Sequence, residues 1–126
     1  MKVIHLSDVA GTEREVRCPK GGFTSYRFIL ERDGMGFSIH KTAIPKGVEQ
    51  HWHYTRHLEA CYCVSGRGFL TDLATGVKYE VVPDVLYALD QNDDHTFQAL
   101  EDTVLISVFN PPVKGSEVHK EDGSYE

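Results

Sequence analysis

The chain has 126 residues, enough for one hydrophobic core and too few for two ordinary domains, so we expect a single domain spanning residues 1–126. Hydrophobic residues make up 40% of the chain and charged residues 25%, which is the balance of a globular protein. The formal net charge of -6, without a cluster of lysine or arginine, argues against nucleic acid and anionic membranes as partners. A small molecule is the better expectation.

The N-terminal stretch, MKVIHLSDVAGTEREV, becomes polar too early to be a signal peptide, and no later stretch is long and apolar enough to cross a bilayer. The three cysteines, Cys18, Cys61 and Cys63, are too few and too unevenly spaced for a disulfide framework. We therefore expect a cytoplasmic protein with free thiols. Cys61 and Cys63 alternate with apolar residues, and we expect them to be small core side chains.

The predicted elements are short. A helical turn is expected near Leu6 to Glu13, and the other segments have no helical pattern. Apolar and polar residues alternate with a period near two in these runs, in chain order: 23–30, 36–44, 57–64, 68–74, 78–82, 85–89, 95–100 and 103–110. Turn residues such as Asp33-Gly34 and Thr75-Gly76 separate the runs. Many short strands at regular spacing predict an all-β sandwich or barrel.

Strand parity predicts which side chains share a face, because residues two apart in a strand point the same way. Four such faces mix polar groups with aromatic, aliphatic or thiol side chains: Phe23, Ser25, Arg27 and Ile29; Ser38, His40 and Thr42; Glu59, Cys61 and Cys63; and Leu105, Ser107 and Phe109. These faces suit the interior of a small barrel that binds a polar ligand. A face exposed to solvent would have a similar pattern.

Two clusters predict a metal site. His51, His53 and Glu59 form an H-x-H-x5-E arrangement in which the histidines end one segment and the glutamate lies inside the next strand. The second cluster, YALDQNDDH, offers Tyr87 and His95. Imidazole nitrogen and carboxylate oxygen suit iron(II), manganese, zinc or nickel.

The same residue types have ordinary structural roles. A histidine near a strand end is usually a surface or hydrogen-bonded residue, which is the default for His5, His57 and His119. Tyr87 is by default a packing residue. Glu59 lies in an apolar run and needs a partner if it is buried.

Several blocks resemble a known family. The segment from Gly47 to Gly66, G-x3-H-x-H-x5-E-x6-G, is similar to the first cupin motif, and Pro83 through His95 lies where the second would. MGFSIHKT, HYTRHLEA, YALDQNDDH, VFNPPVKGSEVH and EDGSY resemble the ectoine synthases, a family of cupins, in order and spacing over nearly the whole chain. The resemblance implies an all-β cupin barrel of the jelly-roll type and a homodimer.

Ectoine synthases are iron-dependent hydro-lyases that close N-γ-acetyl-L-2,4-diaminobutyrate to the compatible solute ectoine, with loss of water. The resemblance implies Fe(II), or another divalent metal, bound by Glu59, Tyr87 and His95, and gives no such role to His51 or His53. It implies acid–base candidates at Tyr54, His57, Glu117 and His119. The substrate-binding residues that it implies, together with the altered pocket positions, are Phe23, Ser25, Arg27, His40, Thr42, Asp93, Ser107 and Phe109. If Glu117 and His119 reach the pocket, the segment 113–126 would act as a lid.

Three positions depart from the family, which typically has tryptophan at Phe23, asparagine at His40 and cysteine at Ser107. Phe23 keeps an aromatic wall without an indole donor, His40 adds a titratable ring, and Ser107 is a smaller and harder polar group. An intact metal site with an altered wall fits either a related substrate or neutral drift.

Two alternatives belong to other functional classes. A cupin metalloenzyme of another reaction class, such as an oxygenase, would consume oxygen. A non-catalytic binding cupin would hold a small zwitterion without turnover.

Overall fold

The computed structural model describes residues 1–18, 21–118 and 124–125. Its elements are α1 (Leu6–Val9), β1 (Glu15–Arg17), β2 (Thr24–Ile29), the 3-10 helix η1 (Glu31–Asp33), β3 (Ser38–Ile44), β4 (Glu49–Trp52), β5 (Leu58–Ser65), β6 (Gly68–Asp72), β7 (Lys78–Val81), β8 (Leu86–Leu89), β9 (His95–Ala99) and β10 (Thr103–Asn110). No helix in these residues is long and apolar enough to span a membrane.

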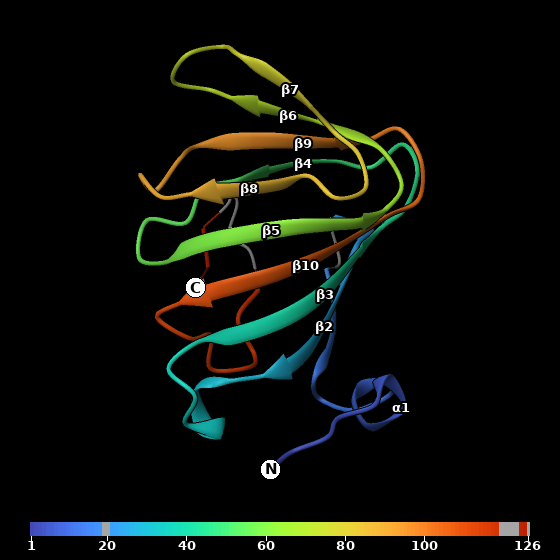
Figure 1. Ribbon diagram of the computed structural model, residues 1–126, viewed down its shortest axis with the longest axis vertical. Coiled ribbons are helices and arrows are strands. Elements are labelled where there is room, and N and C mark those ends of the chain that lie inside the picture. The colour runs from blue at the N-terminus through green and yellow to red at the C-terminus, as the bar shows by residue number, and fades with distance from the viewer. Residues whose placement is uncertain (19–20, 119–123, 126) are drawn as a thin grey trace.

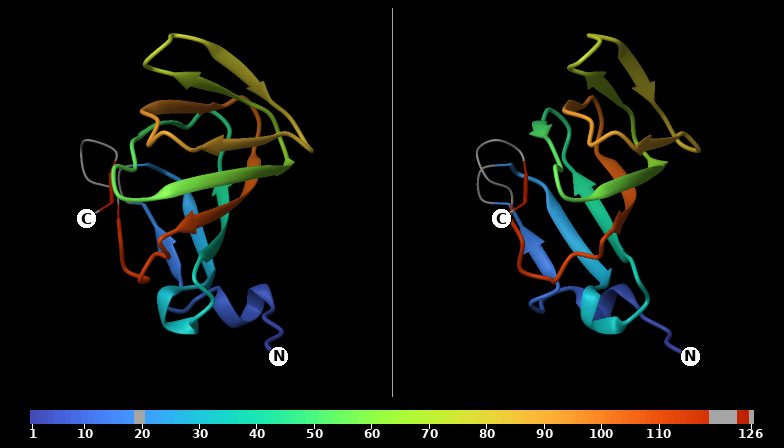
Figure 2. Two further views of the ribbon diagram at one scale, coloured as in Figure 1. Left: turned by 60° about the vertical axis from the view of Figure 1, so that its left-hand side comes forward. Right: turned by 90° about the vertical axis from the view of Figure 1, so that its left-hand side faces the viewer.

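The strands form two antiparallel sheets. The larger sheet has the order β1-β2-β3-β10-β5-β8 and the smaller has the order β4-β9-β6-β7 (Figure 1). The two sheets face each other (Figure 2), and their inner side chains share one apolar cluster that includes Leu105 of the larger sheet and Phe97 of the smaller. The predicted all-β fold is therefore confirmed.

The inner faces follow from the alternation in the sequence. In β3 every second residue is buried, beginning with Ser38, and in β10 every second residue is buried, beginning with Thr103. The four predicted faces all point inward with one exception, Ile29, which is partly exposed. A register shift between Arg27 and Ile29 in the pairing of β2 with β3 breaks the alternation there.

Two strands and one helix end differ from the prediction. The strands β1 and β4 were not anticipated, because both are short and β4 has only one buried residue, Trp52. The helix ends at Val9 rather than Glu13, since Ala10 is extended and Gly11 has a left-handed φ of 76°. The three cysteines are free, and Cys61 and Cys63 are buried, as expected; Cys18, for which no burial was predicted, is buried as well.

Candidate active site

The four inward faces converge on a small inner cavity. It is lined by Phe23, Ser25, His40, Thr42, Trp52, Tyr54, Glu59, Cys61, Leu105, Ser107, Phe109 and Tyr125. The cavity has a volume of about 10 Å³, room for roughly one water molecule. A substrate of the size of an acetylated amino acid therefore cannot enter until some of these side chains move.

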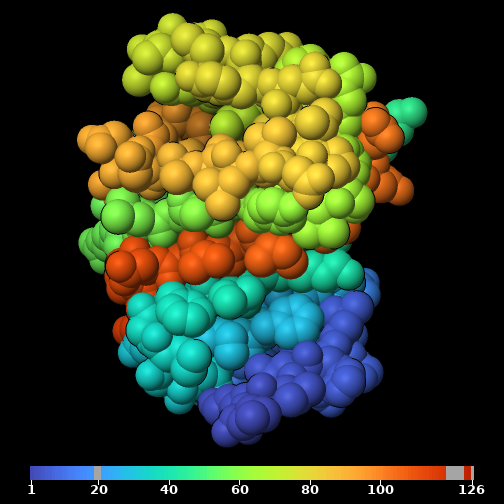
Figure 3. Space-filling model, viewed as in Figure 1, coloured from blue at the N-terminus to red at the C-terminus, as the bar shows by residue number. Residues whose placement is uncertain are grey.

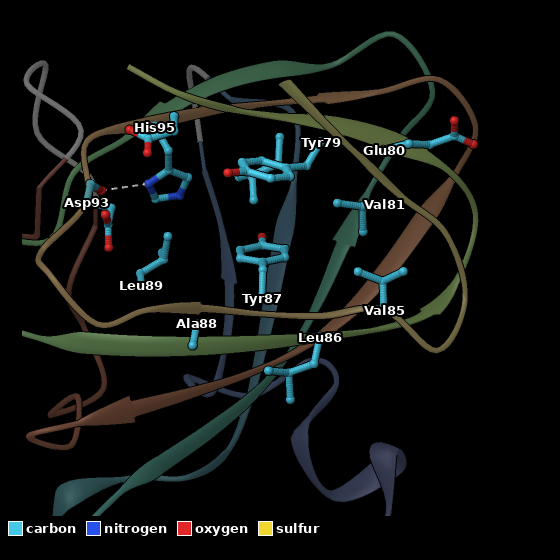
Figure 4. Close-up of a pocket in the computed structure, with 12 residues that line it drawn as sticks. Tyr79, Glu80, Val81, Val85, Leu86, Tyr87, Ala88, Leu89, Asp93 and His95 are labelled. Atoms are coloured by element: carbon cyan, nitrogen blue, oxygen red, sulfur yellow. Dashed lines mark hydrogen bonds between the residues drawn. The ribbon is translucent and has the colours of Figure 1, made fainter. Parts of the chain in front are cut away.

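A larger cavity of about 360 Å³ lies beside β7 and β8 (Figure 4). Its walls are mostly apolar, and its polar lining includes Tyr87, Asp93 and His95. Cys61 of the inner cavity pairs directly with Tyr87 across β5 and β8. The three expected metal-binding side chains thus divide between the two cavities, with Glu59 in the inner one.

His95 is oriented like a metal-binding histidine. Its Nδ1 lies 2.9 Å from the backbone carbonyl oxygen of Asp93 (Figure 4), and because a carbonyl only accepts, Nδ1 must be the protonated nitrogen. Its Nε2 is buried and has no hydrogen-bond partner among the described residues. Burial lowers the pKa of His95, so that the ring is neutral and Nε2 presents a lone pair.

Tyr87 and Glu59 add two buried oxygen donors. The Tyr87 hydroxyl is near the Cys61 thiol, but it makes no hydrogen bond of normal geometry within the described part of the chain. Burial raises the pKa of Tyr87 well above its usual range and that of Glu59 to about 8, although hydrogen bonds from Cys61 and Ser107 oppose the shift of Glu59. A nearby cation would favour the ionised forms of both groups.

These donors fit a divalent metal. A phenol oxygen, a carboxylate oxygen and an imidazole nitrogen, two of them unpartnered, form a set that binds iron, zinc or manganese. His, Cys, Asp and Glu alone do not form a three-residue group that could hold an ion in the described residues, so a metal held by Glu59 and His95 would need a further donor such as the phenol of Tyr87.

Short polar side chains form one wall of the inner cavity. Thr42 Oγ1 lies 3.1 Å from Ser107 Oγ, which in turn lies 3.6 Å from Cys61 Sγ. The His40 ring packs on Phe109 with its centroid 5.1 Å away, and Phe23 meets Trp52 edge to face at 5.2 Å. The three positions that depart from the family pattern, Phe23, His40 and Ser107, all line this cavity.

Aromatic rings form another part of the cavity lining. Tyr54 packs against Tyr125 with ring centroids 4.9 Å apart and against Phe109 at 5.1 Å. The half-buried His57 lies edge to face with Tyr125 at 5.8 Å. Tyr125, near the end of the chain, fills space that a ligand would need.

Arg27 lies beside Tyr125 and contacts Glu117 through a backbone carbonyl. Arg27 is 1% exposed, and it donates hydrogen bonds to Ser25 Oγ and to the backbone carbonyls of Gly115 and Glu117. The Glu117 carboxylate accepts hydrogen bonds from the backbone N–H groups of Lys114 and Gly115. Neither residue lines the inner cavity. His119 lies outside the described residues.

His51 and His53 are on the outside of the smaller sheet. Within β4 and just beyond it, Trp52 and Tyr54 are the buried residues, so parity places the two histidines on the other face. His51 Nε2 hydrogen-bonds to Asp94, and His53 Nδ1 lies 3.9 Å from the same carboxylate. The H-x-H spacing therefore does not direct these rings toward Glu59.

Trp52, Cys61, Leu105 and Tyr125 line the inner cavity without having been predicted as site residues. Parity could have identified Trp52, which lies between two histidines that point outward. Cys61 and Leu105 belong to strand faces that suit a barrel interior. No local pattern marks Tyr125.

Comparisons with known proteins agree with this arrangement. Residues 1–126 match the family model for ectoine synthase. The L-ectoine synthase of Desulfosudis oleivorans is 50% identical over 127 residues, covering 100% of this chain and 97% of that protein. The L-ectoine synthase of Alkalilimnicola ehrlichii is 49% identical over 126 residues, covering 99% of this chain and 94% of that protein.

Solved structures support the same relationship. The crystal structure of ectoine synthase from P. lautus superposes with a TM-score of 0.86 at 36% identity, covering 92% of this chain and 82% of that one. An RmlC-like cupin from Shewanella frigidimarina shares the fold, with a TM-score of 0.62 at 22% identity. The match covers 80% of this chain and 86% of that one. The full-length match, carried on a cupin fold, shows that the chain belongs to the ectoine synthase family.

Proposed function

We propose that this chain catalyses the reaction of the ectoine synthases, the cyclisation of N-γ-acetyl-L-2,4-diaminobutyrate to ectoine with loss of water. Full-length membership of the family supports the reaction class. The observation that carries the proposal for this particular site is the pair of buried, unpartnered donors, Tyr87 Oη and His95 Nε2, which both line the cavity beside β7 and β8.

The reaction joins the α-amine of the substrate to its own acetamide carbonyl carbon, and the carbonyl oxygen leaves as water. Folding the substrate into a ring requires a small enclosed site. Glu59, Tyr87 and His95 would hold a divalent metal, Fe(II) in the first instance, which supplies a Lewis acid for the carbonyl oxygen. Zinc, manganese and nickel suit the same donors.

The nearby titratable groups can move the protons. Burial lowers the pKa of His57 although the charge of Glu117 opposes this, so His57 is neutral at pH 7 and can accept a proton from the substrate amine. Burial beside Tyr125 and Glu59 raises the pKa of Tyr54, so its hydroxyl keeps its proton and can donate a hydrogen bond to the leaving oxygen.

The polar wall would orient the substrate. Thr42 and Ser107 already share a hydrogen bond, and either hydroxyl can turn toward a ligand that enters the cavity. His40 packs on Phe109, so its ring is held in place beside these hydroxyls. Asp93 would act indirectly, because its carbonyl fixes the orientation of His95.

We propose the C-terminal segment, residues 113–126 of a single domain, as a lid. Val113 is buried and donates its N–H to Ser38 Oγ, which anchors the beginning of the segment. Tyr125 lines the inner cavity, whose volume is only about 10 Å³. The substrate can enter if Tyr125 leaves, and the return of the segment would exclude water from the reaction.

We also propose a homodimer. Leu58, Tyr62, Val64 and Leu86 lie on the outer surface of β5 and β8 and are 43%, 39%, 49% and 59% exposed. Figure 3 shows this face, on which β8, β5 and β10 lie side by side. An apolar surface of this kind is usually covered by a partner. Light scattering should give twice the monomer mass for the wild type, and a monomer at micromolar concentration would contradict the proposal.

The expected location is cytoplasmic. Three buried free cysteines support it, because thiols persist in a reducing compartment.

The experiment that tests the reaction is anaerobic incubation with Fe(II) and N-γ-acetyl-diaminobutyrate, with ectoine measured by chromatography. The wild type is compared with the triple variant Phe23→Trp, His40→Asn, Ser107→Cys. We expect product from both and a rate up to about a hundredfold higher from the triple variant, because a misplaced substrate reacts slowly. Equal rates would make the three departures neutral, and absence of product from both proteins would refute the proposed reaction.

A further inference from the structure

Arg27 is a buried cation that is held by the C-terminal segment. Its Nη1 lies 2.8 Å from the carbonyl oxygen of Gly115, and its Nη2 lies 2.7 Å from that of Glu117. Its Nε lies 3.2 Å from Ser25 Oγ, within the inner wall. Among the described residues, Arg27 forms no ion pair with a carboxylate. Its hydrogen-bond acceptors there are these three neutral oxygens.

The Glu117 carboxylate shapes the turn that supplies two of these oxygens. Its Oε2 lies 2.6 Å from the backbone nitrogen of Lys114, and its Oε1 lies 2.7 Å from that of Gly115. One anion thus gathers successive N–H groups on one side of the turn, as in backbone nests that bind anions. The carbonyls of Gly115 and Glu117 are then available to Arg27.

These contacts make Glu117 a poor acceptor for a substrate proton. Burial by itself would raise the pKa of the Glu117 carboxyl. Hydrogen bonds from the backbone N–H groups of Lys114, Gly115 and Glu117 itself outweigh this effect and lower the pKa below its usual value. An effective general base needs a pKa nearer the working pH and a lone pair aimed at the reacting proton.

Arg27 connects the turn to the inner cavity. Its guanidinium carbon lies 5.7 Å from the ring centroid of Tyr125, which packs on Tyr54 at 4.9 Å. Arg27 therefore contacts Ser25 and Tyr125, which both line the cavity. A displacement of Arg27 would therefore change the position of groups that surround the substrate.

We propose that Glu117 is a positioning residue, whose carboxylate folds the 114–117 turn so that the carbonyls of Gly115 and Glu117 hold Arg27 against the inner cavity. This inference deepens the proposed function and rests on it. It assigns to Glu117 a role that acts through Arg27 rather than a proton transfer.

The first experiment does not depend on turnover. Amide hydrogen exchange is measured at Lys114 and Gly115 in the wild type, in Glu117→Gln, and in Glu101→Gln as a control at an exposed carboxylate. Glutamine can accept only one of the two hydrogen bonds, so we expect at least one amide of Glu117→Gln to exchange about tenfold faster. Unchanged exchange in Glu117→Gln would overturn the proposed turn.

The second experiment measures kcat and KM as a function of pH for the wild type, Glu117→Gln and Arg27→Lys. We expect Glu117→Gln to raise KM roughly tenfold while both limbs of the pH profile stay in place. Arg27→Lys should raise KM similarly, because an ammonium cannot hold two carbonyls as a planar fork does. The double variant should be no worse than Arg27→Lys alone, since both changes break one connection.

The outcomes separate this inference from the reaction itself. A wild type that forms no ectoine would refute the proposed function, while the exchange rates would still report on the turn. Loss of one limb of the pH profile in Glu117→Gln, with normal exchange at Lys114 and Gly115, would identify Glu117 as a proton-transfer group and overturn the proposal.

Discussion

Replacing Glu59 by glutamine in the metal-free protein should remove a large pH dependence of stability. Burial raises the pKa of Glu59 from an ordinary 4.5 to about 8. The folded carboxyl therefore binds its proton more tightly than the unfolded one. The resulting stabilisation is fully present below pH 4.5, is lost as the pH rises, and is exhausted once the pH exceeds about 8. Glutamine has the same shape and does not titrate in this range.

The size of the effect follows from the two pKa values. Each unit of pKa difference corresponds to about 1.4 kcal/mol, so the full shift from 4.5 to about 8 represents about 5 kcal/mol. Between pH 6 and pH 9 the Glu59 carboxyl alone should lower the free energy of unfolding by about 3 kcal/mol. Other groups titrate as well, but their contributions are common to wild type and variant and cancel in the difference.

The assay is urea unfolding of chelator-treated wild type and Glu59→Gln at pH 6 and at pH 9. We expect the wild type to lose about 3 kcal/mol more than the variant over this interval. Added divalent metal should restore the wild type at pH 9, because it binds the ionised carboxylate of the folded state, and it should have a smaller effect on Glu59→Gln. The reasoning fails if the free energy of unfolding changes equally with pH in the wild type and in Glu59→Gln.

Of three further predictions, two concern the metal and the third concerns Gly66, between β5 and β6. Elemental analysis should find about one iron(II)-class metal per chain, largely lost in Glu59→Ala and His95→Ala, and full occupancy in these variants would refute the ligand set. His51→Ala should keep most of its metal, because its ring pairs with Asp94 on the outer face. Gly66→Ala should lower the stability in thermal unfolding by about 2 kcal/mol or more, because Gly66 has a φ of +90° and an added Cβ would lie 2.3 Å from the Asp102 carbonyl oxygen. Gly76→Ala is its control, with a φ of +74° but no atom within 4 Å, and should cost only about 1 kcal/mol; equal losses would contradict the steric argument.

Much of the fold could be predicted because alternation is a local property. Each predicted run from 23–30 to 103–110 coincides with a strand to within two residues at either end, and the buried residues of β3 and β10 alternate as parity requires. The prediction failed where the local signal is weak. The strand β4 contributes one buried side chain, and its existence depends on pairing with β9, more than forty residues away.

The candidate site was predictable to a similar extent. Parity placed His40, Thr42, Glu59 and Ser107 on strand faces that suit a barrel interior, although a solvent-exposed face would have a similar pattern, and the structure brings all four to the inner cavity. The roles of His51 and His53 could not be decided by spacing, because an H-x-H pair can point to either side of a strand. Burial of Trp52 decided the direction of the two histidines, since burying a large apolar ring in the core is more favourable than burying an imidazole.

The sequence by itself determined most of the strands, the side chains that share a strand face, and the family, because a two-residue period is set by backbone geometry and the motifs are contiguous. Only the tertiary structure decided which of these groups act together. Arg27 meets the carbonyls of Gly115 and Glu117 across 88 and 90 residues, and Tyr125 reaches Tyr54 and Phe109. Such contacts carry no local signature, because they form only when the packing of two sheets brings the C-terminal segment to the end of the barrel.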